Sequence, residues 1–447
     1  MTIRFGRGET VHGDVIASPT PRTRLPPRVL PVLYFGAAHV ALALAFGAVA
    51  MDPRGASGFF YHARMLGIVH LVTLGWITAS ILGSLYIVGP IALRVWIPAT
   101  WLDYTAFALV CIGIVGMVAH FWIQDYAGMA WSAGTVGAGI LAVGAHVVRR
   151  LSAATLPRAV SAHIVLAFVN VLGAASMGVL IGFDKVYHFL PGFVLANVLA
   201  HAHLAAIGWA SMMVVGLAYR LLPMVLPAAM PSGPRLWISA VLLQAGASGL
   251  FVTLLLRGPL AWIFALIVVA GFAAFLSQVV WMLRRPRPSP PGLRRPDPAA
   301  LHAAASFASL GVASGLGVWL TIAEPSSATL RIAMAYGVFG LVGFLAQMVV
   351  GMEGRLLPIF AWYWAYANTG YTGTVTSQHT MSWRHGQELV FVLWLFGVPA
   401  LAGGLAFDAV PFVTAAAWCL FIATLIDTAN AIRILRHAFL TPPSARL

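Results

Sequence analysis

Two histidines stand at the same point of a repeated sequence phrase. Residues 70–76 and residues 203–209 share the pattern His-Leu-x-x-x-Gly-Trp, which places His70 and His203 six residues before a tryptophan. Both phrases lie inside long apolar runs. An imidazole inside a bilayer must be paired, hydrated or coordinated, and two facing imidazoles at one depth are the axial ligands of a six-coordinate haem iron. The pattern therefore predicts a haem held between His70 and His203.

A third histidine, His201, stands two residues before His203. Residues two apart on a helix point about 200° from each other, so the two rings face different surroundings. Helical phase does not decide which of them is the partner of His70. We favour His203 because it occupies the repeat-equivalent position, and His201 stays open as the alternative ligand of haem or of a metal.

Other side chains near these phrases are candidates for contacts with a cofactor. His62 precedes His70 by about two helical turns, so it is predicted to meet a haem propionate or a bound metal. Arg64 and Lys185 are predicted to pair with propionates. Trp76 and Trp209 follow glycines and are predicted to pack on the edge of a porphyrin.

The amino-acid composition indicates that these residues lie within a membrane. The chain has 447 residues, of which 60% are hydrophobic and only 9% are charged, and its mean hydropathy is +0.90. That is too little polar surface for a soluble protein of this size, so the chain is predicted to be a polytopic membrane protein. The first thirty residues are rich in Arg and Pro and lack the pattern of a secretory signal peptide.

The charge and the cysteines exclude several kinds of protein. The net charge of +14 comes almost entirely from arginines at the ends of apolar runs, which indicates membrane topology and no nucleic-acid partner. Cys111 and Cys419 lie far apart within apolar segments, so neither a disulfide framework nor a metal cluster is expected. There is no Cys-x-x-Cys-His segment, so a haem would be of the non-covalent b type.

Twelve apolar runs are long enough to cross a membrane as helices. They begin near residues 30, 61, 102, 128, 159, 193, 236, 259, 299, 330, 387 and 409. The arginine-rich connectors, such as those at Arg149, Arg284 and Arg433, are expected on the cytoplasmic side, with both termini. This predicts a bacterial inner-membrane protein with one membrane domain over residues 30–438 and cytoplasmic tails at residues 1–29 and 439–447.

The two histidine phrases also agree in their depth in the membrane, and they belong to a longer repeat. His70 and His203 each follow a helix start by about eight to ten residues, roughly 12 to 15 Å below the outer surface. Residues 83–90 match residues 216–223, 133 residues further on, and residues 348–358 echo residues 213–223 in a third copy, another 135 residues further on. In that copy Val338 stands at the histidine position. We expect an all-α fold of three four-helix arcs, over residues 30–150, 158–284 and 299–438.

Polar residues also interrupt other apolar runs. His39 lies near mid-membrane on the first helix with no assigned role, and Asp427 lies inside the twelfth, where proton conduction and helix packing are both open roles. Glu353 and Arg355 are expected to form an ion pair with each other. Residues 362–387 are predicted to be the longest cytoplasmic connector.

The twelve-helix arrangement with histidines in its outer half resembles subunit I of the haem-copper oxidase superfamily, over roughly residues 30–438. In that family a helix-two histidine and one member of a His-x-His pair bind a low-spin haem, and the other member binds a high-spin haem beside copper. By this resemblance His70 matches the helix-two ligand, and His201-Ala202-His203 looks like the pair. The same His-Ala-His segment also resembles the NnrS family of membrane haem and copper proteins linked to nitric oxide metabolism.

These observations predict a haem-binding redox protein with a bis-histidine b-type haem, in electron transfer or in the reduction of nitric oxide or oxygen. It stays open whether the chain is an oxidoreductase of the nitric oxide or oxygen reductase type. It also stays open whether the chain binds copper. A cytochrome c or a quinol is the expected electron donor, and membrane lipid and small subunits are the expected partners. No His-Pro-Glu-x-Tyr segment supplies a copper ligand, so a non-catalytic haem or copper sensor is one alternative. A transporter with a histidine relay is another.

Overall fold

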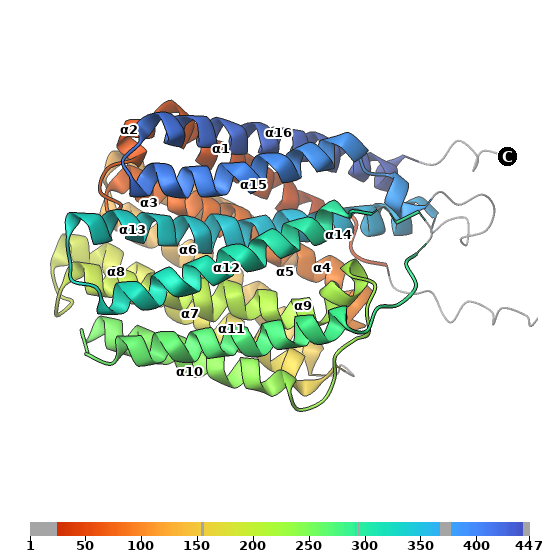
Figure 1. Cartoon of the computed structure of the whole chain (residues 1–447), viewed down its shortest axis with the longest axis horizontal. Helices are drawn as coiled ribbons and strands as arrows, with labels where there is room; N and C mark the ends of the chain where they lie inside the picture. The colour runs from red at the N-terminus through yellow and green to blue at the C-terminus, as the bar shows by residue number, and fades with distance from the viewer. Residues whose placement is uncertain (1–24, 153–155, 291, 294, 367–376, 441–447) are drawn as a thin grey trace, which may run out of the picture.

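The structure is a computed structural model of the chain, and it describes residues 25–152, 156–290, 292–293, 295–366 and 377–440. These residues fold into long helices that lie side by side in an elongated bundle (Figure 1), with no β-strand beyond an isolated bridge between Ala228 and Pro286. Residues 1–24 of the predicted N-terminal tail and residues 441–447 of the C-terminal tail lie outside the described residues.

Twelve helices of the described chain are long and apolar enough to cross a membrane, as predicted. Each begins within three residues of its expected start, so the chain is a multi-pass, all-α membrane protein. The spans are α1 (Leu30–Met51), α3 to η2 (Ala63–Leu93), α5 (Trp101–Ile123), α6 (Tyr126–Leu151), α7 (Arg158–Tyr187), α8 to α9 (Val194–Val225), α10 (Leu236–Leu255), α11 (Ala261–Leu283), α12 (Pro298–Ile322), α13 to α14 (Ser327–Tyr366), α15 (Arg384–Ala406) and α16 (Val410–Phe439).

Three of these spans form the centre of the bundle. In the apolar 18-residue stretches of the spans Ala63–Leu93, Val194–Val225 and Ser327–Tyr366, 67%, 56% and 61% of the residues are buried, whereas no such stretch in the other nine spans exceeds 50%. Each contains a π-helical segment, namely η1 (Leu71–Thr78), η3 (Leu204–Ser211) and η4 (Val338–Ala346). π-Helical segments are rare and are frequently found at functional sites. The first two begin directly after His70 and His203.

Indole groups join the three central spans to one another. The Trp76 Nε1–H donates to the Ala346 carbonyl at 3.2 Å, and the Trp209 Nε1–H donates to the Thr78 hydroxyl at 3.0 Å. Because a buried indole N–H needs an acceptor, these bonds fix how the central helices face each other.

A glycine in each central span lets a neighbouring helix approach closely. A Cβ added at any of the three would meet the Cβ of a residue on the neighbouring helix at 2.6 to 2.8 Å. The pairs are Gly83 with Tyr34, Gly216 with His163, and Gly351 with His302. Small residues at such points allow backbones to pack within a membrane. The spacing of the pairs matches the register of the expected threefold repeat, which itself stays a prediction.

One predicted boundary is wrong. The connector expected over residues 362–387 is shorter, because α14 (Gln347–Tyr366) continues as a helix through Trp362, and α15 begins at Arg384. The rings of Trp362 and Tyr366 pack at 5.7 Å between centroids, one helical turn apart, and such a contact supports the extra turn of helix. Residues 367–376 of this connector lie outside the described residues.

Candidate functional site

An apolar cavity lies between the first two central spans and the helices α5, α6 and α7. Its volume is about 200 Å³, below the roughly 300 to 1,000 Å³ of an ordinary ligand pocket. Much of its wall is made of small side chains and aliphatic groups, including Ala174, Gly178, Ala205 and Val136. Two imidazoles, those of His70 and His201, interrupt this apolar wall.

His70 ends α3 (Ala63–His70) and presents one ring nitrogen to the cavity. Its Nδ1–H donates to the Leu66 carbonyl of the preceding turn at 2.7 Å. Because a carbonyl only accepts, this bond places the proton of a neutral ring on Nδ1 and leaves a lone pair on Nε2. Phe121 packs beside the ring at 5.2 Å between centroids and limits its rotation.

His201 has the same chemistry on α8 (Val194–His203). Its Nδ1–H donates to the Ala174 carbonyl of α7 at 2.9 Å, so the neutral ring carries its lone pair on Nε2. Gly178 leaves room for the ring, since a Cβ there would lie 3.1 Å from the His201 Cε1 atom. The structure therefore brings His70 and His201 into the wall of one cavity.

The structure places His203 elsewhere. Its ring is not among the residues that line the cavity. Its Nδ1–H donates to the Leu199 carbonyl at 2.8 Å, and its Nε2 accepts the hydroxyl of Tyr336 on α13 (Ser327–Gly337) at 3.1 Å. Both ring nitrogens are thus occupied by protein groups. The sequence favoured His203 over His201 because His203 occupies the repeat-equivalent position. A sequence repeat does not show in which direction a side chain points from its helix.

The mouth of the cavity carries a cation between two aromatic rings. Lys185 Nζ lies 4.6 Å from the ring centre of Tyr61 and 4.5 Å from that of Tyr126, an arrangement that stabilises an ammonium group. Burial, with smaller effects of Tyr126 and Asp184, raises the pKa of Tyr61 to about 12. The Tyr61 hydroxyl is therefore a hydrogen-bond donor at neutral pH, and it is buried without a partner.

The other predicted contacts lie outside the cavity, with one exception. Arg64 pairs with Asp52 at 3.5 Å, and both side chains are more than half exposed. His62 caps the start of α3 and bonds backbone groups through both ring nitrogens. Trp76 is fully buried against His39, with ring centroids 5.2 Å apart. Trp209 does line the cavity.

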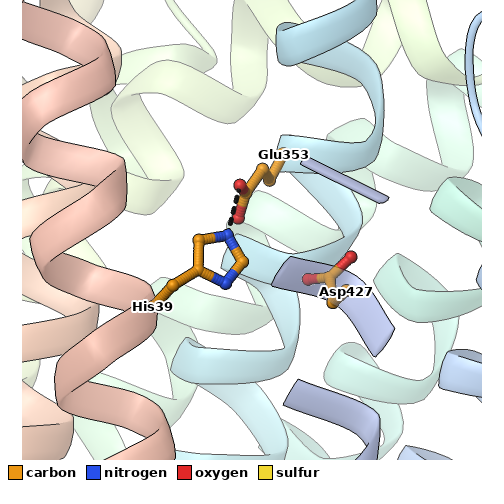
Figure 2. A group of neighbouring side chains, drawn as sticks. All are labelled: His39, Glu353 and Asp427. Carbon is orange, nitrogen blue, oxygen red and sulfur yellow. Dashed lines mark hydrogen bonds and ion pairs between the residues drawn. The ribbon is translucent and has the colours of Figure 1, made fainter. Parts of the chain in front are cut away.

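A second polar site lies away from this cavity. His39 on α1, Glu353 on α14 and Asp427 on α16 are buried together, and their ligand atoms lie within 4.8 Å of one another (Figure 2). The predicted ion pair between Glu353 and Arg355 is wrong, because residues two apart on a helix point in nearly opposite directions. Glu353 instead bonds His39 at 2.8 Å, and Arg355 pairs with Asp297.

Sequence reasoning singled out all three members of this buried group, but it paired Glu353 with Arg355 and did not group Glu353 with His39 and Asp427. The available signal was a polar residue within each of three apolar runs. Hydropathy does not report which helices are neighbours, so the group itself needed the structure.

The chain was also compared with known proteins. No protein-family model matches it, and no curated protein matches it either.

Proposed function

We propose that the chain binds a b-type haem in the cavity between His70 and His201 and serves electron transfer in the membrane. One observation carries this proposal. Two imidazoles face the same cavity, each with Nδ1–H bonded to a backbone carbonyl, so that each neutral ring has its Nε2 lone pair directed away from that bond. Metal-binding histidines are oriented in this way by their second nitrogen.

The chemistry of the cavity wall suits a flat apolar group with an acidic edge, and a haem would need the side chains of this wall to move apart. Its wall is almost entirely apolar, which excludes water and lowers the local dielectric constant. Lys185 and the Tyr61 hydroxyl stand at the mouth, where they can bind carboxylates such as haem propionates. When bound, the haem supplies one-electron chemistry at its iron.

Electron transfer is favoured over reduction of nitric oxide or oxygen. His70 and His201 would both hold the haem, and a haem held by two histidines would supply electron transfer rather than gas reduction. A copper centre beside His70 would need further ligands nearby. Within the described chain, three metal-binding side chains come together at His39, Glu353 and Asp427. This group lies away from the cavity. The proposal includes the bacterial inner membrane as location and a cytochrome c or a quinol as donor.

Absorption spectra of the purified full chain test this function. We expect a Soret band and, on reduction, sharp α and β bands, which indicate bis-histidine ligation. His70→Ala and His201→Ala should each abolish the six-coordinate spectrum, whereas His203→Ala, the matched control from the same helix, should retain it.

Two outcomes would contradict the proposal. A colourless protein from cells well supplied with haem would favour the transporter alternative. Loss of the spectrum in His203→Ala but not in His201→Ala would show that the cavity assigned here is the wrong one.

A further inference from the structure

The cluster of His39, Glu353 and Asp427 joins three spans that are far apart in the sequence (Figure 2). The exposed fractions of these residues are 4%, 3% and 9%. The His39 Nε2 atom lies 2.8 Å from a Glu353 oxygen. Two carboxyl groups and an imidazole are therefore held together within the apolar bundle, where isolated charges are strongly destabilised.

The proton on His39 can be placed by following the hydrogen bonds of Thr428. The Thr428 hydroxyl donates its single hydrogen to the Thr424 carbonyl at 2.7 Å. Its oxygen therefore accepts at the 3.0 Å contact with His39 Nδ1, so Nδ1 carries a hydrogen. The Nε2 atom is then the one that faces Glu353, and it has a lone pair whenever the ring is neutral.

One oxygen of the cluster has no partner. The Glu353 Oε2 atom is fully buried and makes no hydrogen bond with the described residues. An unsatisfied carboxylate oxygen at such a depth is costly unless it binds a cation. The arginine nearest along the chain, Arg355, is committed to Asp297 and His379.

We propose that His39, Glu353 and Asp427 bind a divalent transition-metal ion such as Zn²⁺ or Mn²⁺, at a site separate from the haem cavity. A divalent ion neutralises both carboxylates while the imidazole stays neutral, which a single proton cannot do. One nitrogen and two oxygen ligands suit these borderline and hard cations. Ligand atoms around such an ion are about 3 to 3.5 Å apart, so the present separations of at most 4.8 Å need only small side-chain movements.

A second cavity provides space beside the cluster. Its volume is about 60 Å³, and Glu353, Ser80 and Ser84 form part of its wall. The Ser80 hydroxyl is also buried without a partner. Water bound there would complete the coordination of an ion that has three protein ligands.

Metal content of the full chain tests the site. The protein is purified through a tag without histidines, treated with a chelator, and equilibrated with micromolar ZnCl₂ or MnCl₂ before mass-spectrometric metal analysis. We expect one tightly bound ion per chain. Asp427→Asn and Glu353→Gln, which keep side-chain shape, should lose it, and Thr428→Val should weaken binding about 10- to 100-fold, as for other residues that orient a metal ligand.

The matched control is His163→Gln. His163 is equally buried but bonds only the Ala159 carbonyl and Ser239, with no carboxylate nearby, so this variant should bind metal as the unchanged protein does. Asp427→Asn should keep the haem spectrum, which separates failure of this site from failure of the proposed function. The inference is overturned if the unchanged protein binds neither ion, which would leave a shared proton as the occupant, or if Asp427→Asn and Glu353→Gln bind as tightly.

Discussion

His201 and His39 are both buried imidazoles inside the membrane domain, yet their surroundings differ sharply. In each ring Nδ1 is held by an oxygen, the Ala174 carbonyl for His201 and the Thr428 hydroxyl for His39. The difference lies at Nε2, which faces an open apolar cavity in one case and a buried carboxylate in the other. An apolar cavity suits an apolar cofactor, whereas paired carboxylates suit a small cation. The space and charge around the second nitrogen thus decide what each histidine can bind.

The largest expected difference between the two sites is in stability. His39→Ala would leave Glu353 buried without its partner, and breaking such a buried pair costs about 3–5 kcal/mol. His201→Ala removes one hydrogen bond beside an existing cavity and should cost only about 1 kcal/mol. Thermal unfolding of the two variants, produced without haem and stripped of metal, measures the contrast. Equal losses of stability would show that the cavity histidine is as tightly integrated as the cluster.

Gly178→Ala is expected to have an intermediate effect, which is on the affinity for haem. The added Cβ would lie 3.1 Å from the His201 Cε1 atom, and overpacking of this kind costs about 1–3 kcal/mol. We expect weaker haem binding, by about tenfold or more, as measured by titration of the haem-free protein. Gly134→Ala is the matched control, since its Cβ would meet its nearest neighbour at an ordinary 3.9 Å. Similar affinity in both variants would argue against His201 as a ligand.

The smallest effect is expected at the mouth of the cavity. Lys185→Gln removes the cation held between Tyr61 and Tyr126, and the loss of one half-buried charge contact should weaken haem binding by about 1 kcal/mol, roughly fivefold. Arg64→Gln should leave the affinity unchanged, because Arg64 pairs with Asp52 at the surface. Affinity that falls in Arg64→Gln and not in Lys185→Gln would reverse the assignment of the two cations.

The sequence predicts the spans well and the contacts between them poorly. Apolar run length fixes where a helix can cross a membrane, so the starts of the twelve spans agree with the structure. His70 was found from the repeated phrase, but the choice between His201 and His203 depends on which neighbouring helix each ring meets. Contacts between neighbouring helices belong to the tertiary structure, and a local sequence pattern does not show them. Glu353 likewise meets His39, a residue 314 positions away, and no local pattern reports such a pair.

The π-helical segments allow the two ends of each central span to be oriented independently. An α-helix turns by about 100° per residue, so one residue gained or lost rotates everything beyond it by that amount. A wider turn can absorb such a residue, and η1 lies between His70 and the glycine at position 83. Insertions or deletions within η1, η3 or η4 can therefore redirect a ligand at one end without disturbing helix packing at the other. The same scaffold can in this way accept new cofactor geometries during evolution or design.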